Sequence, residues 1–129
     1  MRKQGGGSII NFGSICGVRA HRAFVPYNTT KAALVHLTTS LARDLAPDNI
    51  RCNIVCPGAI GPTASTAQHA ESEGKTLEEL CEELAAAHMI PRMGSPREVA
   101  NAVLWLASDE SSFTTAQSLF VDGGWHGKE

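Results

Sequence analysis

The apolar positions of the chain follow two periods, and the changes between them predict an alternation of strands and helices. Three short runs rich in Ile, Val and Phe lead into turns containing Gly or Pro, as strands do: residues 8–12, 50–56 and 118–121. Between the first two runs, leucines recur every three or four residues, which predicts a helix over residues 27–46. Pro26 suits the start of this helix and Pro47 its end. The apolar stripe of the helix consists of Leu34, Leu37, Thr38, Leu41, Ala42 and Leu45.

Two further helices are predicted by the residues that precede them. Thr76 and Ser95 each stand three positions before a glutamate, which is the spacing of a capping box. We therefore expect helices over residues 77–88 and 96–107. Their apolar stripes consist of Leu77, Leu80, Cys81 and Leu84 in the first, and Val99, Val103 and Leu106 in the second.

Two segments show no clear period. Residues 14–22 have the composition of a loop. Residues 58–75 are rich in Gly, Pro, Ser, Thr and Ala, and we expect them to form a long flexible connection. Long connections of this kind often act as lids over a binding site.

The order of these elements predicts an α/β fold. A strand, a helix and a second strand in succession predict parallel pairing through a right-handed crossover. Three strands with helices between them predict a small parallel sheet in one domain spanning residues 1–129. Parallel sheets are usually continued sideways, so three strands leave an open edge beside Ile9 and Ile10. We expect another strand to pair with that edge.

Composition and charge narrow the classes of function. A net charge of -2 argues against a nucleic-acid partner. No apolar run is long enough to span a membrane, and the first residues lack the apolar core of a signal peptide, so we expect a cytoplasmic protein with no membrane partner. The four cysteines include no C-x-x-C pair, which predicts buried thiols rather than disulfides or metal ligands.

Three residues have a spacing that suits proton transfer. Tyr27 and Lys31 are four residues apart on a predicted helix, so their side chains share one face. A lysine ammonium near a tyrosine stabilises the phenolate, which makes the hydroxyl a usable acid or base near neutral pH. Ser14 follows the first predicted strand, at the carboxyl end where open α/β sheets bind their ligands.

Taken together with other short motifs, these residues resemble the short-chain dehydrogenase/reductase family. The similar segments run in order through almost the whole chain and comprise residues 7–14, 27–34, 51–60, 91–100, 108–110 and 121–124. The resemblance implies the C-terminal part of a doubly wound, Rossmann-type domain. It also implies hydride transfer between NAD or NADP and a small alcohol or carbonyl substrate.

The resemblance assigns roles to individual residues. Tyr27 would be the general acid/base, Ser14 would orient the substrate oxygen, and Lys31 would assist Tyr27 and bind the nicotinamide ribose. Pro57, Gly58 and the backbone at Ile60 would line the nicotinamide carboxamide. The family commonly has Thr where Pro62 stands, and Thr63, one place later, is a candidate for binding the cofactor, as is Tyr27. Residues 59–90 would form the substrate lid, and the helix over residues 27–46 would form a homo-oligomer interface.

The cofactor fingerprint of the family is absent from the sequence. Gly5, Gly6 and Gly7 precede a strand, whereas the phosphate-binding glycines follow a strand and open a helix. We therefore expect a fragment that lacks the N-terminal cofactor-binding half. The alternative is a truncated, non-catalytic product or partner subunit that keeps the oligomerisation helix.

Two other sites are weaker interpretations. A serine hydrolase elbow around Ser14 needs Gly where Phe12 and Cys16 stand. A zinc site would have to draw on residues whose spacing matches no common structural pattern, namely Cys56, His69, Cys81 and His88. We expect no metal.

Overall fold

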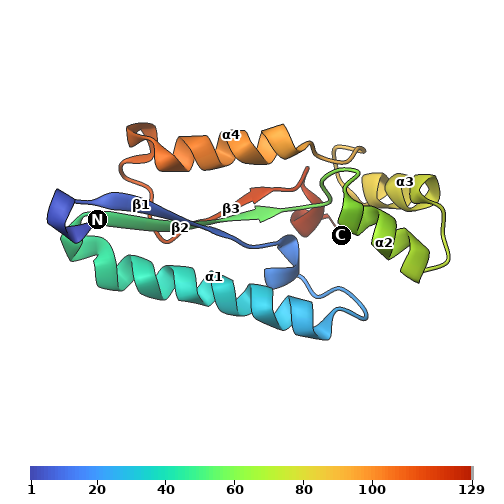
Figure 1. Ribbon diagram of the computed structural model, residues 1–129, viewed down its shortest axis with the longest axis horizontal. Coiled ribbons are helices and arrows are strands. Elements are labelled where there is room, and N and C mark those ends of the chain that lie inside the picture. The colour runs from blue at the N-terminus through green and yellow to red at the C-terminus, as the bar shows by residue number, and fades with distance from the viewer. Residues whose placement is uncertain (129) are drawn as a thin grey trace.

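The computed structural model describes residues 1–128 and is built on a three-stranded parallel sheet (Figure 1). Its strands are β1 (Gly7–Phe12), β2 (Ile50–Pro57) and β3 (Ser118–Val121), in the order β1-β2-β3. β2 pairs in parallel with both neighbours. The predicted parallel sheet is confirmed, and the carboxyl ends of all three strands therefore point the same way.

Helices cover both faces of this sheet and extend beyond one end (Figure 1). α1 (Val25–Leu45) lies along one face and α4 (Pro96–Ala107) along the other. α2 (Ala64–Ser72) and α3 (Leu77–Ala87) pack together beyond the carboxyl ends of the strands. None of the helices in residues 1–128 is long and apolar enough to cross a membrane. Short 3₁₀ turns complete the chain: η1 (Arg2–Gln4), η2 (Ile15–Gly17), η3 (Ala46–Asp48), η4 (Asp109–Ser111) and η5 (Trp125–Gly127).

The core lies on both sides of the central strand. Successive side chains of a strand point to opposite faces of the sheet. On one face, Val55 of β2 packs with Val99 and Leu106 of α4. On the other face, α1 buries Thr38 and Ala42. Small residues at these two positions allow α1 to lie close to β2, in which Ile50 and the five successive residues 52–56 are buried.

β1 forms an edge that is only half buried. Its first five residues have intermediate burial, and Phe12 at its end is 53% exposed. On the same sheet face, Leu104 of α4 is 69% exposed. Among residues 1–128, no strand pairs with the outer side of β1. The open edge expected from the sequence is present.

Two expectations from the sequence are wrong. Residues 58–75 are not an irregular connection, because α2 occupies Ala64–Ser72 within them. Thr63 and Thr66 form a capping box at its start, and Thr66 and Ala70, four residues apart, are buried. The small residues that had suggested a loop thus suit a short helix packed closely on its neighbours. Leu37 was assigned to the buried stripe of α1, but it is 46% exposed since the buried line passes through Thr38 and Ala42.

Other boundaries differ by one or two residues. α1 begins at Val25, with Pro26 in its first turn, and ends at Leu45. α3 ends one residue earlier than expected, so His88 becomes its C-cap. Both predicted capping boxes, at Thr76 and Ser95, are confirmed.

A buried asparagine makes hydrogen bonds to the segment that precedes β3. Asn53 on β2 is fully buried and donates through Nδ2 to the Thr114 carbonyl at 2.8 Å. Its Oδ1 accepts the Gln117 backbone N–H at 3.0 Å. The amide therefore satisfies two backbone groups of the segment that leads into β3, which sets where that strand begins.

We expect Asn53→Ala to destabilise the fold by about 3 kcal/mol, since it leaves two backbone groups without partners in the interior. Urea unfolding measures this loss. Gln117→Ala is the control, because the Gln117 side chain is exposed and the change should stay within about 0.5 kcal/mol. Equal losses in the two variants would contradict this role of Asn53.

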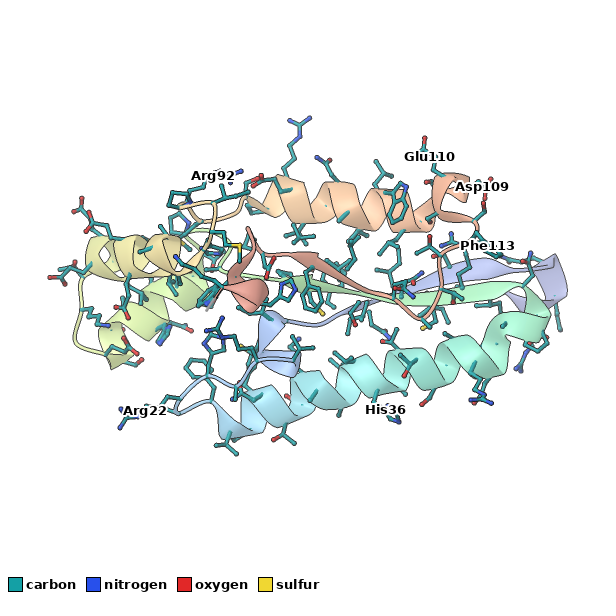
Figure 2. The ribbon with its side chains drawn as sticks, turned by 180° about the vertical axis from the view of Figure 1, so that it is seen from behind. Arg22, His36, Arg92, Asp109, Glu110 and Phe113 are labelled. Atoms are coloured by element: carbon teal, nitrogen blue, oxygen red, sulfur yellow. The ribbon has the colours of Figure 1, made fainter. Side chains whose placement is uncertain are left out.

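An ion pair and a cap fix the start of α4. Glu98 Oε1 accepts from Arg92 Nη2 at 2.6 Å, and Glu98 Oε2 accepts the Ser95 backbone N–H at 2.8 Å. The bond from Arg92 and the bonds from Ser95 lower the pKa of Glu98 to about 2. Figure 2 shows Arg92 beside the first turn of α4, at the opposite end of the helix from Glu110.

The folded-state pKa of Glu98 is depressed, so its contribution to stability is present above the ordinary value of 4.5 and is lost as the pH falls towards 2. Glu98→Gln should therefore lower the unfolding midpoint at neutral pH, and its difference from the unmodified chain should shrink between these two pH values. Glu110→Gln is the control, since Glu110 makes no ion pair within residues 1–128. A difference that is constant from pH 7 to pH 2 would refute the assignment.

Candidate functional site

A cleft of about 1300 Å³ opens at the carboxyl ends of β1 and β2. It lies between the turn after β1, the start of α1, the loop after β2, the helix pair α2–α3 and the exposed side of α4. Most of the residues that the sequence singled out line it together: Ser14, Tyr27, Pro57, Gly58, Ile60 and Thr63. Lys31 does not line the cleft but reaches its rim through Phe12, as described below.

Ser14 follows β1 and is held by its own turn. Gly13 continues the ladder by donating to the Val55 carbonyl at 2.8 Å. A Cβ on Gly13 would meet Cys56 Sγ at 2.8 Å, so only glycine allows this close approach to β2. Ser14 is buried and caps η2, because its Oγ accepts the Cys16 N–H at 3.1 Å. That bond uses a lone pair of the hydroxyl and leaves its hydrogen available to an oxygen in the cleft.

Tyr27 and Lys31 occupy the first turns of α1. The Tyr27 side chain is 43% exposed, and its ring packs edge-on against Phe24, with 6.1 Å between the ring centroids. Lys31 Nζ donates to the Phe12 carbonyl at 3.0 Å and lies 5.5 Å from the centre of the Tyr27 ring. The ammonium therefore bridges α1 to the end of β1 and holds a positive charge beside the tyrosine.

The loop after β2, residues 58–63, is fixed by its backbone groups. The Ala59 carbonyl accepts the Gly94 N–H at 2.9 Å, and the Gly61 N–H donates to the Gly94 carbonyl at 3.0 Å. The Ala59 N–H donates to His88 Nε2 at 3.3 Å. Among residues 1–128, the N–H of Ile60 has no acceptor. The 58–63 loop thus presents one free backbone donor, at a residue that lines the cleft.

The hydroxyl of Thr63 is engaged elsewhere. Thr63 is the N-cap of α2, and its Oγ1 lies 2.9 Å from Ser65 Oγ and 3.1 Å from Thr66 Oγ1. Pro62, which stands where the family commonly has Thr, has no hydroxyl. The structure places Thr63 at the cleft but with its side chain already used in the helix cap.

Sequence reasoning missed several aromatic residues of the cleft, among them Phe24, His21 and Trp125. His21 and Trp125 both line it, with their rings nearly perpendicular and 5.2 Å apart. Burial lowers the pKa of His21, and the nearby charge of Arg19 lowers it further. Arg19 Nη1 also donates to the Trp125 carbonyl at 2.8 Å. No local pattern could have paired His21 with a tryptophan more than a hundred residues later.

The competing sites gain no support from the geometry. The only partner of Ser14 Oγ within residues 1–128 is the Cys16 N–H, so no histidine is placed to activate this serine. Burial raises the pKa of the Cys56 thiol, which favours its neutral form. All four cysteines are free, and in the described part of the chain no three metal-binding side chains form a group.

Known proteins match this chain along nearly its full length. A family model described as Enoyl-(Acyl carrier protein) reductase matches residues 1–126. A 2-keto-3-deoxy-L-fuconate dehydrogenase of Xanthomonas campestris pv. campestris is 39% identical over 126 residues, which are 97% of this chain and 42% of that protein. The match extends to solved structures.

Two of those structures share the fold closely. The ligand-free aldohexose dehydrogenase of Thermoplasma acidophilum superposes with a TM-score of 0.93 at 38% identity, over 100% of this chain and 51% of that one. A short chain dehydrogenase family protein from Francisella tularensis gives a TM-score of 0.86 at 32% identity, over 94% of this chain and 51% of that one.

The chain belongs to the short-chain dehydrogenase/reductase family. Its sheet is part of the Rossmann-type fold of these relatives, as the resemblance in the sequence had implied. The chain spans about half the length of the relatives it matches. The described residues carry no glycine-rich turn of the cofactor fingerprint, since Gly5 and Gly6 precede β1 and Gly7 is its first residue.

Close packing at the 58–63 loop leaves no room for a side chain at Gly58. A Cβ on Gly58 would lie 2.9 Å from both Asp122 Cα and His88 Nε2. We expect Gly58→Ala to destabilise the fold by about 1 to 3 kcal/mol through overpacking, measured by urea unfolding. Gly127→Ala is the matched control, since the nearest atom to its Cβ is Met89 Cε at 3.7 Å. If both variants were equally stable, the close approach at Gly58 would be disproved.

Proposed function

We propose that this chain carries the catalytic part of a nicotinamide-dependent oxidoreductase that acts on a small alcohol or carbonyl compound. The observation that carries the proposal is the meeting of Ser14, Tyr27 and the 58–63 loop in one cleft, although they come from three separate segments. Two of the relatives described above are named 2-keto-3-deoxy-L-fuconate dehydrogenase and aldohexose dehydrogenase. They support an alcohol or carbonyl as the reacting group.

The proton chemistry would be divided between three side chains. Ser14 would donate its free hydrogen to the substrate oxygen and orient it. Tyr27 would give a proton to that oxygen in reduction, or take one in oxidation. Lys31 would favour the phenolate through its positive charge and would reach the ribose of the cofactor from the rim of the cleft. Its bond to the Phe12 carbonyl would keep it in place between turnovers.

The residues present fit the nicotinamide end of NAD or NADP. A carboxamide needs a hydrogen-bond donor at the edge of an apolar surface, and the free N–H of Ile60 supplies one beside Pro57 and Val99. When bound, the nicotinamide would supply or accept the hydride. Thr63 would contribute through its backbone or through contact, because its hydroxyl caps α2. α2 and α3, within residues 59–90, would form the lid over the substrate.

A second function has its own support in the exposed apolar surface. On α1, Val25 is 71% exposed and Leu37 is 46% exposed. We propose that this side of α1 mediates association between copies of the chain. A non-catalytic partner subunit would need this surface and the open edge of β1, but it would not need Ser14, Tyr27 or Lys31.

Titration of the purified chain with NADH and with NADPH, followed by cofactor fluorescence, tests the proposal. Because the residues of the cleft fit the nicotinamide end of the cofactor and the phosphate-binding turn is absent from residues 1–128, we expect weak, saturable binding at millimolar concentration, which Tyr27→Phe retains. Turnover of an aldohexose by Tyr27→Phe should fall at least about 100-fold because the proton acceptor is lost. Sedimentation of the same samples gives the oligomeric state.

The two functions predict different results in this titration. Circular dichroism first establishes that each sample is folded. A folded chain that binds neither cofactor at millimolar concentration would refute a cofactor site in this chain and favour the partner subunit. Turnover that is unchanged in Tyr27→Phe would refute the role of the tyrosine.

A further inference from the structure

His88 lies where three parts of the molecule meet. It is the C-cap of α3 and its side chain is 2% exposed. Its ring packs against Trp125, with 4.9 Å between the ring centroids. Its Nε2 accepts the Ala59 N–H at 3.3 Å. His88 does not itself line the cleft, so any effect on a ligand passes through these neighbours.

The bond to Ala59 determines the protonation of the ring. A nitrogen that accepts a hydrogen bond carries a lone pair, so Nε2 is unprotonated and a neutral imidazole carries its hydrogen on Nδ1. Nδ1 is buried and has no nitrogen or oxygen partner among residues 1–128. Trp125 is the aromatic ring packed against this histidine, and contact of an N–H with an aromatic ring is a weak hydrogen bond. His88 is thus set as the neutral Nδ1–H tautomer.

In this tautomer His88 can accept the hydrogen bond from the Ala59 N–H, which no backbone group of the loop accepts. Gly94 takes up the Ala59 carbonyl and the Gly61 N–H from one side. Gly94 does not accept a hydrogen bond from the Ala59 N–H, and His88 is the acceptor for that group. With its two neighbours held, Ile60 is left with its N–H free at the cleft. The His88 side chain thus accepts a backbone hydrogen bond that a neighbouring strand would accept in a sheet.

Hydrogen bonds connect His88 and the residues beside it to the last residues of the described chain. Lys128 Nζ donates to the His88 carbonyl at 3.0 Å and to the Ala86 carbonyl at 2.6 Å, which ties the end of α3 to the C-terminus. Asp122 Oδ2 accepts hydrogen bonds from the ring Nδ1 of His126 at 2.7 Å and from the backbone N–H of His126 at 2.8 Å. Although burial opposes it, these bonds hold the pKa of Asp122 below its ordinary value. These bonds join Asp122 to the turn that carries Trp125, which packs against His88.

We infer that His88 is a positioning residue that holds the 58–63 loop with the Ile60 N–H presented to the ligand, and that it joins the lid helix α3 to that loop. The histidine acts through the Ala59 N–H and touches no ligand. The identity of the ligand as a nicotinamide carboxamide rests on the proposed function, whereas the tether to Ala59 does not.

The experiment compares His88→Gln with His88→Leu in the full chain. Gln keeps an acceptor near the position of Nε2, and Leu removes it. In the unmodified chain, nitrogen-15 NMR of the ring should show protonated Nδ1 and unprotonated Nε2. Hydrogen exchange at the Ala59 amide should be slow in the unmodified chain and in His88→Gln, and roughly 10-fold faster in His88→Leu, as expected for loss of one hydrogen bond.

Cofactor binding then tests the positioning role. The dissociation constant for NADH should rise by up to about 10-fold in His88→Leu and stay within about 3-fold in His88→Gln. A loss of overall packing alone would not be rescued by the glutamine. If NADH bound equally well to the unmodified chain and His88→Leu, the positioning role would be overturned.

The remaining outcomes separate the tether from the proposed function. A ring protonated on Nε2 in the unmodified chain would overturn the tether, even if His88→Leu failed to fold. Unchanged exchange at Ala59 in a folded His88→Leu would also overturn it. If the ring and exchange results held while the unmodified chain bound no cofactor, the tether would be supported and only the proposed function would fail.

Discussion

Parallel pairing of β1 with β2 is the constraint on which the site depends. Because the two strands run in the same direction, their carboxyl ends meet at one edge, and the segments that follow them open onto one cleft. The crossover between them must then cover the sheet, and α1 does so while its first turn returns to the same edge. Tyr27 therefore lines the same cleft as Ser14. The bond from Lys31 to the Phe12 carbonyl links helix and strand at that point.

The shape of the cleft depends largely on hydrogen-bonded backbone groups and on one backbone N–H, that of Ile60, that has no acceptor. Gly13 and Gly58 allow approaches to neighbouring segments that a Cβ would block. Around the 58–63 loop, Gly94 and His88 take up the available backbone groups and leave the Ile60 N–H free. Unpaired backbone donors are uncommon in protein interiors, and one that lies at a cleft is well placed to bind a ligand.

The open side of the molecule follows from the same sheet. β1 has a neighbour on one side only, and Phe12 and Leu104 remain exposed beside it. The relatives are about twice as long as this chain, and their structures contain it within a larger fold. The candidate site, with Ser14, Tyr27 and the free backbone donor of Ile60, lies within residues 1–128.

The sequence by itself determined the strands, the long helices, the two capping boxes and the residues Ser14, Tyr27 and Lys31. These features depend on near neighbours in the chain, through side-chain period, cap spacing and helical proximity. Only the tertiary structure decided that residues 64–72 form a helix, that Leu37 faces outward, and that His21, His88 and Trp125 pack together. Those outcomes depend on contacts between segments tens of residues apart, and short-range sequence patterns do not predict such contacts. Loop and cap residues such as His88 have no period, so packing alone assigns their partners.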